Sequence, residues 1–162
     1  MEDSIMNTNK ENKAIVEKLI VDALVNNDVA TVKDLVDATA VTHRAGFASL
    51  YQATGYAIPQ DGNFMDWMRD GWDILHAALS DQKVRIESIV AEDNQVIAHF
   101  HYDVLHSGNF TGMLATNKRI EWDEIGIFKF NDQGKVQEMW YMIDELRVAQ
   151  ELGHKLDQRV SK

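Results

Sequence analysis

Residues that can transfer a proton occur among tryptophans and tyrosines in the second half of the sequence. Alternate residues of a β-strand point to the same face, and helical spacing does the same for a helix, so the side chains that can meet are predictable. The predicted inward surface consists of the apolar Trp67, Trp72, Tyr102, Trp122, Trp140 and Met142 and the polar His106, Glu124, Glu138 and Asp144. This composition is typical of a small-molecule site, although an ordinary core with a polar rim has the same composition. In such a site we expect the substrate to contact Trp67, Trp72, Tyr102, Trp122, Glu124, Trp140 and Met142.

Asp144 is the best placed of these residues for acid/base chemistry. A carboxylate enclosed by tryptophans is destabilised in its charged form, which raises its pKa and lets it exchange a proton near neutral pH. Asp144 also precedes a predicted helix and can be its N-cap, and the two roles can coexist. Glu124 and Glu138 are more commonly solvated charges at strand ends than acids. His43 is more commonly a surface or hydrogen-bonded histidine than a catalytic one.

Three histidines, His99, His101 and His106, suggest a metal site, because imidazole is the commonest metal ligand. Strand parity argues against it, since His99 and His101 point to one side of their strand and His106 to the other. The sequence has no cysteine, which excludes thiolate ligands, disulfides and cysteine nucleophiles. It also shows no phosphate-binding glycine loop, catalytic-triad order or dinucleotide fingerprint. We therefore expect no functional metal and no cofactor.

The elements that position these residues change from helical to extended along the chain. Apolar residues recur at helical spacing over 10–26, and Asp28 can cap a second, short helix. A short extended piece over 40–43 and a packed, aromatic loop or lid over 45–63 follow, and Asn63 caps a third helix. From there a period of two predicts four strands, over 84–90, 95–106, 119–130 and 135–143.

A short helix from Glu145, which Gly153 can end, completes the predicted elements. Helices first and a strand meander second predict an α+β domain whose helices pack on one face of a curved antiparallel sheet. The sequence has neither an internal repeat nor a recognisable boundary, so we expect a single domain over 1–162 with its core over about 10–153.

The composition excludes several classes of partner. The net charge of −10, with only 16 lysines and arginines, opposes nucleic-acid binding. The first 12 residues are polar, and no run approaches the roughly 20 apolar residues of a membrane span. A chain without cysteines also fits a reducing compartment. We therefore expect a cytoplasmic protein that binds neither nucleic acid nor membranes.

The segment from Arg119 to Gly153 resembles the end of SnoaL-like polyketide cyclases and related ester cyclases. The matching features are Ile125-Gly-Ile-Phe-Lys-Phe130, the turn and strand Asp132-Gln-Gly-Lys-Val-Gln-Glu-Met-Trp140, Asp144, and Gln150-Glu-Leu-Gly153. The connection His106-Ser-Gly-Asn-Phe-Thr-Gly112 and the position of His43 also fit this family. The resemblance extends from about Lys13 to Gly153.

The resemblance implies the cone-shaped α+β barrel of the nuclear transport factor 2-like (cystatin-like) superfamily, with a pocket between sheet and helices and a homodimer formed through the sheet. It implies Asp144 as the acid/base of a cofactor-free intramolecular aldol closure on a small apolar or polyketide-like carbonyl compound. His106 or His43 would then hydrogen-bond the enolate oxygen. Two features depart from the family: the loop over 47–62 is longer and more aromatic, and Glu124 stands where many members have a small residue.

Three functions remain open at this level. The first is a cyclase, isomerase or lyase, which predicts a raised pKa for Asp144. The second is a small-molecule-binding protein without turnover, which predicts that binding survives Asp144→Ala. The third is a dimeric interaction module whose pocket is filled by Trp122 and Trp140.

Overall fold

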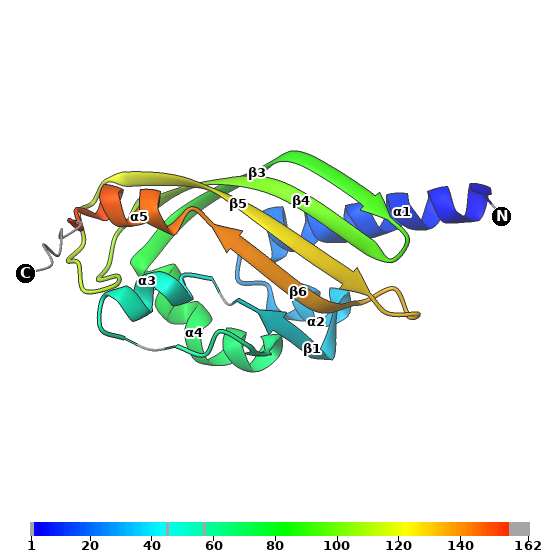
Figure 1. Ribbon diagram of the computed structural model, residues 1–162, viewed down its shortest axis with the longest axis horizontal. Helices are drawn as coiled ribbons and strands as arrows, with labels where there is room; N and C mark the ends of the chain where they lie inside the picture. The colour runs from blue at the N-terminus through cyan, green and yellow to red at the C-terminus, as the bar shows by residue number, and fades with distance from the viewer. Residues whose placement is uncertain (1, 45, 57, 156–162) are drawn as a thin grey trace, which may run out of the picture.

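A curved, six-stranded sheet with helices against one of its faces makes up the molecule (Figure 1). A computed structural model describes residues 2–44, 46–56 and 58–155, with side chains from residue 8 onward. The strands are β1 (Val36–His43), β2 (Gly62–Asn63), β3 (Leu79–Glu92), β4 (Gln95–His106), β5 (Arg119–Phe130) and β6 (Val136–Ile143). Their order is β2-β1-β6-β5-β4-β3, and within the described residues β2 and β3 form the two edges, so the sheet does not close. The predicted α+β class is confirmed.

Strands β4, β5 and β6 match the predicted ranges closely, and β3 begins five residues earlier, at Leu79. The main difference is β1, which extends the predicted piece over 40–43 back to Val36 and pairs in parallel with β6. All other strand pairs are antiparallel. The β-branched Val36 and Thr39 favour this longer strand, in which Val36, Ala40 and Thr42 face inward.

The helices lie mostly where the sequence predicts them. They are α1 (Glu2–Glu17), the π-helix η1 (Lys18–Ala23), α2 (Val29–Leu35), α3 (Ala48–Ala53), α4 (Phe64–Ala78) and α5 (Glu145–Leu152). Helix α1 begins before the predicted start at Lys10, because the polar N-terminal segment contains no glycine or proline to stop it. Asp28 and Asn63 cap α2 and α4 as predicted. The predicted lid over 45–63 contains α3, and its residues 45 and 57 lie outside the described residues.

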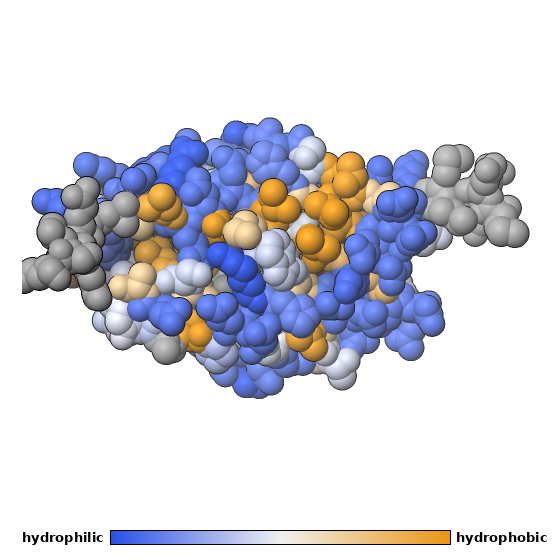
Figure 2. All heavy atoms as spheres, viewed as in Figure 1, coloured by the Kyte–Doolittle hydropathy of each residue, from blue (hydrophilic) through white to orange (hydrophobic). Residues whose placement is uncertain are grey.

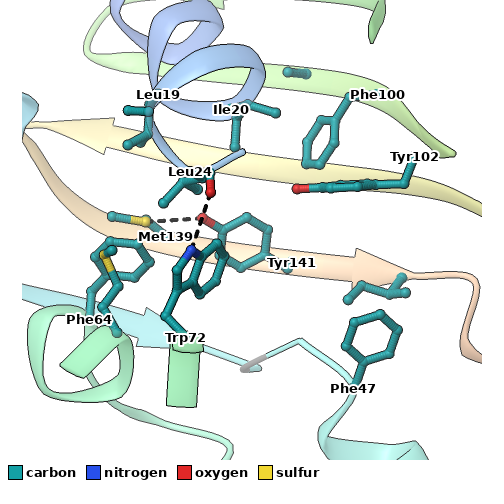
Figure 3. Close-up of a cluster of buried hydrophobic side chains, with 14 of the residues drawn as sticks. Leu19, Ile20, Leu24, Phe47, Phe64, Trp72, Phe100, Tyr102, Met139 and Tyr141 are labelled. Atoms are coloured by element: carbon teal, nitrogen blue, oxygen red, sulfur yellow. Dashed lines mark hydrogen bonds between the residues drawn. The ribbon is translucent and has the colours of Figure 1, made fainter. Parts of the chain in front are cut away.

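The core lies between the inner face of the sheet and the helices. Helix α1 packs on β3 and β4, whereas α4 packs on β1 and β3. Figure 3 shows side chains of η1 and α4 meeting those of the sheet, with Ile20, Phe64 and Phe100 fully buried. Each such side chain contributes roughly 1.5–3 kcal/mol on burial. The same packing fixes the walls of the cavity described below.

Within the described part of the chain, none of the helices has the length and apolar character that a membrane crossing requires.

Candidate active site

A cavity lies between the inner face of the sheet and the helices η1 and α4. Its lining is mostly apolar: Ile20, Leu24, Thr42, Gly46, Phe47, Phe64, Trp67, Trp72, Leu75, Leu79, Gln82, Tyr102, Trp122, Glu124, Tyr141 and Ile143. Its volume is about 50 Å³, which holds a few water molecules. We call this space the inner cavity. An apolar space with few polar groups has the chemical character of a small-molecule site.

Five of the seven side chains that were predicted to bind substrate line the inner cavity, namely Trp67, Trp72, Tyr102, Trp122 and Glu124. The Tyr102 and Trp122 rings stack at 4.9 Å between centroids, and Trp67 meets Trp72 edge to face at 5.2 Å. The Trp72 indole nitrogen donates a hydrogen bond to the Leu24 carbonyl at 3.2 Å (Figure 3). These contacts fix the aromatic walls, while the binding role of the five residues stays a prediction.

The predicted inward face of β6 is wrong beyond its first residue. Glu138 pairs with Lys129 but Val136 pairs with Phe130, so the strand carries a bulge that reverses its parity. As a result Trp140 is half-buried and Met142 exposed on the outer face, and Tyr141 and Ile143 line the cavity instead. Both alternating sets on this strand contain large apolar residues, so hydrophobicity alone does not reveal the bulge.

Glu124 is the only carboxylate among the described residues that line the inner cavity. It extends from β5, where only 7% of the residue is exposed, and its Oε2 accepts a hydrogen bond from the Trp122 indole at 3.3 Å. Burial raises the pKa of Glu124 to about 8, aided by the charge of Glu145 and opposed by the Trp122 hydrogen bond and by Arg44. Near neutral pH this carboxyl can therefore both give and take a proton.

Two tyrosines lie close enough to Glu124 to feel its charge. Burial, and then the Glu124 charge, raise the pKa of Tyr102 well above its usual value, and the same two causes raise the pKa of Tyr141. Both therefore remain neutral hydroxyl donors at any physiological pH. The Tyr141 hydroxyl donates to the Met139 sulfur at 3.1 Å, a weak acceptor (Figure 3). A better acceptor in the cavity can compete for this donor.

Arg44 and Glu145 form a pair of charges beside the cavity. Arg44 donates to the Tyr141 carbonyl at 3.1 Å and lies 3.8 Å from Glu145. Both side chains are largely buried. The positive charge of Arg44 lowers the pKa of Glu124, and the negative charge of Glu145 raises it.

The three residues predicted to be catalytic do not meet in this cavity. Asp144 is exposed and caps α5, accepting a hydrogen bond from the Arg147 amide at 3.2 Å, as its position before a helix predicted. His43 lies on the outer face of the sheet, with its nitrogens 3.0 Å from Asp61 and 3.1 Å from Glu138. None of the three lines the inner cavity. Their catalytic role stays a prediction, which this geometry does not support.

His106 faces inward as predicted and is fully buried. Its Nδ1 lies 3.0 Å from the Thr116 hydroxyl, and its Nε2 has no hydrogen-bond partner among the described residues. Burial lowers the pKa of His106, so the ring is neutral at pH 7. Because His106 does not line the inner cavity, its position indicates a structural role at the end of β4.

The outer face of the sheet holds the other two histidines, as parity predicted. His99 and His101 both approach the Asp123 carboxylate, at 3.0 and 3.2 Å. In the part of the chain that the structure describes, no group of three or more histidines, aspartates and glutamates is arranged to hold a metal ion. On the same outer face, Glu138 is paired with Lys129 at 3.0 Å, and this pairing lowers the pKa of Glu138.

Sequence reasoning missed several residues of the inner cavity. Thr42 and Tyr141 belong to strands whose extent or parity it did not predict. Phe47 is the N-cap of α3, has a left-handed backbone (φ 62°) and packs edge to face on Trp122 at 5.5 Å, which brings the predicted lid segment into the cavity wall. Thr42 was detectable as a polar residue within a β-branched run, whereas the turn at Phe47 carries no sequence signal.

Together the open, curved sheet, the helices on it and the inner cavity between them match the α+β fold of the nuclear transport factor 2-like type. The family model for SnoaL-like polyketide cyclases matches residues 14–152. The chain therefore belongs to the SnoaL-like polyketide cyclase family. A comparison with curated proteins gave no match.

Solved structures of similar fold include two from Streptomyces. AclR of Streptomyces galilaeus, a proposed hydroxylase, has a TM-score of 0.71 at 23% identity, covering 89% of this chain and 96% of its own. IdmH of Streptomyces antibioticus, a proposed polyketide cyclase, has a TM-score of 0.72 at 21% identity, covering 88% and 98%. A proposed SnoaL-like cyclase of Jannaschia sp. CCS1 reaches 0.73 at 16% identity, covering 91% and 95%. At these identities the likeness concerns the fold.

Proposed function

We propose that this chain is a cofactor-independent acid/base enzyme, a cyclase, isomerase or lyase, acting on a small apolar or polyketide-like carbonyl compound. The acid/base is Glu124 in place of Asp144. The observation that carries this proposal is a carboxyl group buried in an apolar cavity, with its pKa raised to about 8. Such a perturbed group in a cavity is characteristic of catalytic sites. Membership of the polyketide cyclase family supports the same reaction class.

In the aldol form of the reaction, the Glu124 carboxylate removes a proton from the carbon next to a carbonyl group. The C–H electron pair becomes an enolate, whose carbon forms a bond to a second carbonyl carbon of the same molecule. The oxygen of that carbonyl becomes an alkoxide, and the Glu124 carboxyl returns the proton to it. The product is an isomer of the substrate, so the step needs no oxidant, reductant or cofactor.

The enolate oxygen needs hydrogen-bond donors that the cavity supplies. Tyr102 and Tyr141 both line it, and both remain neutral hydroxyls because their pKa values are raised. Donors placed in an apolar site stabilise a developing negative charge more than donors in water do. The Trp122 N–H, now bound to Glu124, holds that carboxyl in place.

The test is exchange of α-protons for deuterium in heptane-2,6-dione, a small neutral diketone that can also close to a ring. NMR follows the exchange with the wild-type protein, Glu124→Gln and the matched control Asp144→Asn. We expect the wild type and Asp144→Asn to catalyse exchange and Glu124→Gln to lose at least about a hundredfold. The wild-type rate should also rise with pH through about 8 as Glu124 ionises. If Asp144→Asn lost activity and Glu124→Gln did not, the acid/base would be Asp144 and not Glu124.

A non-catalytic binding protein is the second candidate. The observation that favours it is that Asp144, His106 and His43, the residues expected to be catalytic, lie outside the inner cavity, whose apolar lining suits a bound ligand. This candidate predicts that carbonyl compounds bind without α-proton exchange at any pH, and that Glu124→Gln binds them as well as the wild type does.

We propose a homodimer through the outer face of the sheet. Figure 2 shows apolar side chains gathered over the strands on this face. Ile97 pairs with Ile127, and Ile125 with Met142, so the apolar side chains form a continuous patch across β4, β5 and β6. Ile97, Ile125 and Met142 are each more than 40% exposed. Light scattering should give twice the chain mass for the wild type and the single mass for Ile125→Lys; a wild-type monomer would contradict the dimer.

A further inference from the structure

The inner cavity adjoins a second hollow that opens to the surface. This outer groove is bounded by residues 58–63 on one side and by Asp66, Asp70 and Gly71 of α4 on the other, and its volume is about 410 Å³. Thr42 and Trp67 line both hollows. The two side chains therefore form the partition between a small inner space and a larger outer one.

Trp67 is the larger part of this partition. It is half-buried and extends from α4, packed against Trp72 at 5.2 Å and stacked beside Phe64 at 6.3 Å between ring centroids. Only α4, through Trp67, and β1, through Thr42, contribute to both linings, so Trp67 is the large side chain whose movement would affect both hollows. Rotamer changes of a partly exposed side chain are fast compared with most enzyme turnover.

Thr42 supplies a polar group at the junction. The residue is only 3% exposed, and its hydroxyl oxygen has no hydrogen-bond partner among the described residues. A buried hydroxyl without a partner is destabilising, so such groups are normally satisfied by a neighbour, a water molecule or a ligand. Its place in the lining of both hollows makes a ligand that passes through the junction a suitable partner.

The outer groove carries negative charge. Among the described residues that line it, three are aspartates, Asp61, Asp66 and Asp70, and none is basic. Arg69, which is not part of the lining, pairs with Asp66 and Asp70, each at 2.8 Å, and His43 lies 3.0 Å from Asp61. Three carboxylates against one guanidinium leave the groove negative, which opposes an acidic ligand and favours an amine.

We propose that the ligand is an elongated carbonyl compound that spans both hollows and ends in a protonated amine. Its carbonyl end lies in the inner cavity, a hydroxyl or carbonyl group on its middle part bonds to Thr42, and its cationic end lies in the outer groove. Trp67 is the gate between the two. This inference rests on the proposed function for the identity of the reacting end, while the outer groove, the gate and the charge preference concern binding alone.

The test uses three phenyl ketones that differ only at the end of a para propyl chain, which carries an ammonium, a hydroxyl or a carboxylate group. Calorimetry at low salt measures their affinities for the wild-type protein. We expect the ammonium probe to bind about tenfold more tightly than the carboxylate probe. The preference should disappear in a variant with Asp61→Asn, Asp66→Asn and Asp70→Asn, and be reduced in Asp61→Asn alone. Equal affinities of the three probes, or no binding of any of them, would overturn the proposal.

Two further variants test the partition. Thr42→Val keeps the shape of the side chain without its hydroxyl. It should weaken several-fold an ammonium probe that carries a hydroxyl on the first carbon of its propyl chain, and leave the three probes above, which have no polar group there, unchanged. In stopped-flow binding, Trp67→Ala should raise the association rate constant about tenfold. The matched control Ile74→Ala, an exposed residue of the same helix that lines neither hollow, should leave it unchanged. An unchanged association rate in Trp67→Ala would reject the gate.

The acid/base role of Glu124 and the binding role of the outer groove can be refuted independently of each other. If Glu124→Gln abolishes proton exchange but the wild type shows no charge preference, the catalytic proposal stands and the outer groove does not bind the ligand. If the charge preference is found but Glu124→Gln exchanges protons as fast as the wild type, the groove inference stands and the acid/base assignment is wrong.

Discussion

Replacing Glu124 with glutamine should change how the stability of the protein depends on pH. The folded protein holds the Glu124 proton up to a pKa of about 8, whereas the unfolded chain releases it at the ordinary value of 4.5. Between these values the folded state binds more protons than the unfolded state, so the free energy of unfolding falls as pH rises. Glutamine cannot ionise and keeps an oxygen that can accept the Trp122 hydrogen bond. The variant should therefore lack this part of the pH dependence.

The size of the effect follows from the two pKa values. A pKa that is about 3.5 higher in the folded state corresponds to about 5 kcal/mol of lost stability once pH exceeds both values. Over the accessible range from pH 5 to pH 9 the loss is about 4 kcal/mol. The wild type should thus become less stable relative to Glu124→Gln by this amount, with the steepest change between pH 5 and 8.

Urea unfolding at pH 5, 6, 7, 8 and 9 measures this difference directly. Glu92→Gln, which removes an exposed carboxylate at the end of β3, is the matched control and should run parallel to the wild type. A difference between Glu124→Gln and the wild type that stays constant across this range would refute the reasoning, because Glu124 would then titrate alike in the folded and unfolded chains.

Three other expectations concern residues outside the inner cavity. Asp144→Ala removes the N-cap of α5 and should lower the free energy of unfolding by about 1 kcal/mol in thermal melts, with ligand affinity unchanged; a large loss of affinity would place Asp144 at the site after all. Burial lowers the pKa of His106, so its ¹⁵N imidazole signals should change to those of a neutral ring at a lower pH than the ordinary 6.5, and a midpoint at or above 6.5 would be inconsistent with this burial. Gly108→Ala places a Cβ 2.7 Å from the Ala77 carbonyl oxygen and should lower the free energy of unfolding by about 1–3 kcal/mol. In Gly71→Ala the new Cβ meets nothing within 4 Å, so this change in α4 should raise the free energy of unfolding by about 0.5–1 kcal/mol. Equal effects of the two substitutions would contradict the packing described.

The central strands were predictable because their two faces differ clearly in polarity. In β4 and β5 the inward sets are almost wholly apolar, and the outward sets carry residues such as His99, Asp123 and Lys129. The long-range pairing was not predictable in the same way. The parallel pairing of β1 with β6 joins segments about 100 residues apart, and no local periodicity encodes it.

The residues that form the walls of the candidate site were largely predictable from the sequence, but the residue that carries the proposed acid/base chemistry was not. Trp122 and Glu124 share a face by simple alternation, so their meeting follows from the sequence. The depth at which Glu124 lies does not, because it depends on how distant segments, among them η1, α4 and the turn at Phe47, come together around the cavity. Asp144 shows the converse: its place before a helix predicted the cap, and the bulge in β6 and the turn into α5 leave its side chain exposed.

The most direct test of the account is the pKa of Glu124 itself. Titration of its ¹³C-labelled side-chain carboxyl by NMR, with Glu124→Gln to assign the signal, gives this value without any substrate. We expect a midpoint near 8, as for a carboxyl buried in the inner cavity and able to exchange a proton with a carbonyl compound. A midpoint near 4.5 would mean that water reaches the carboxylate, and would contradict both the buried site and its proposed acid/base role.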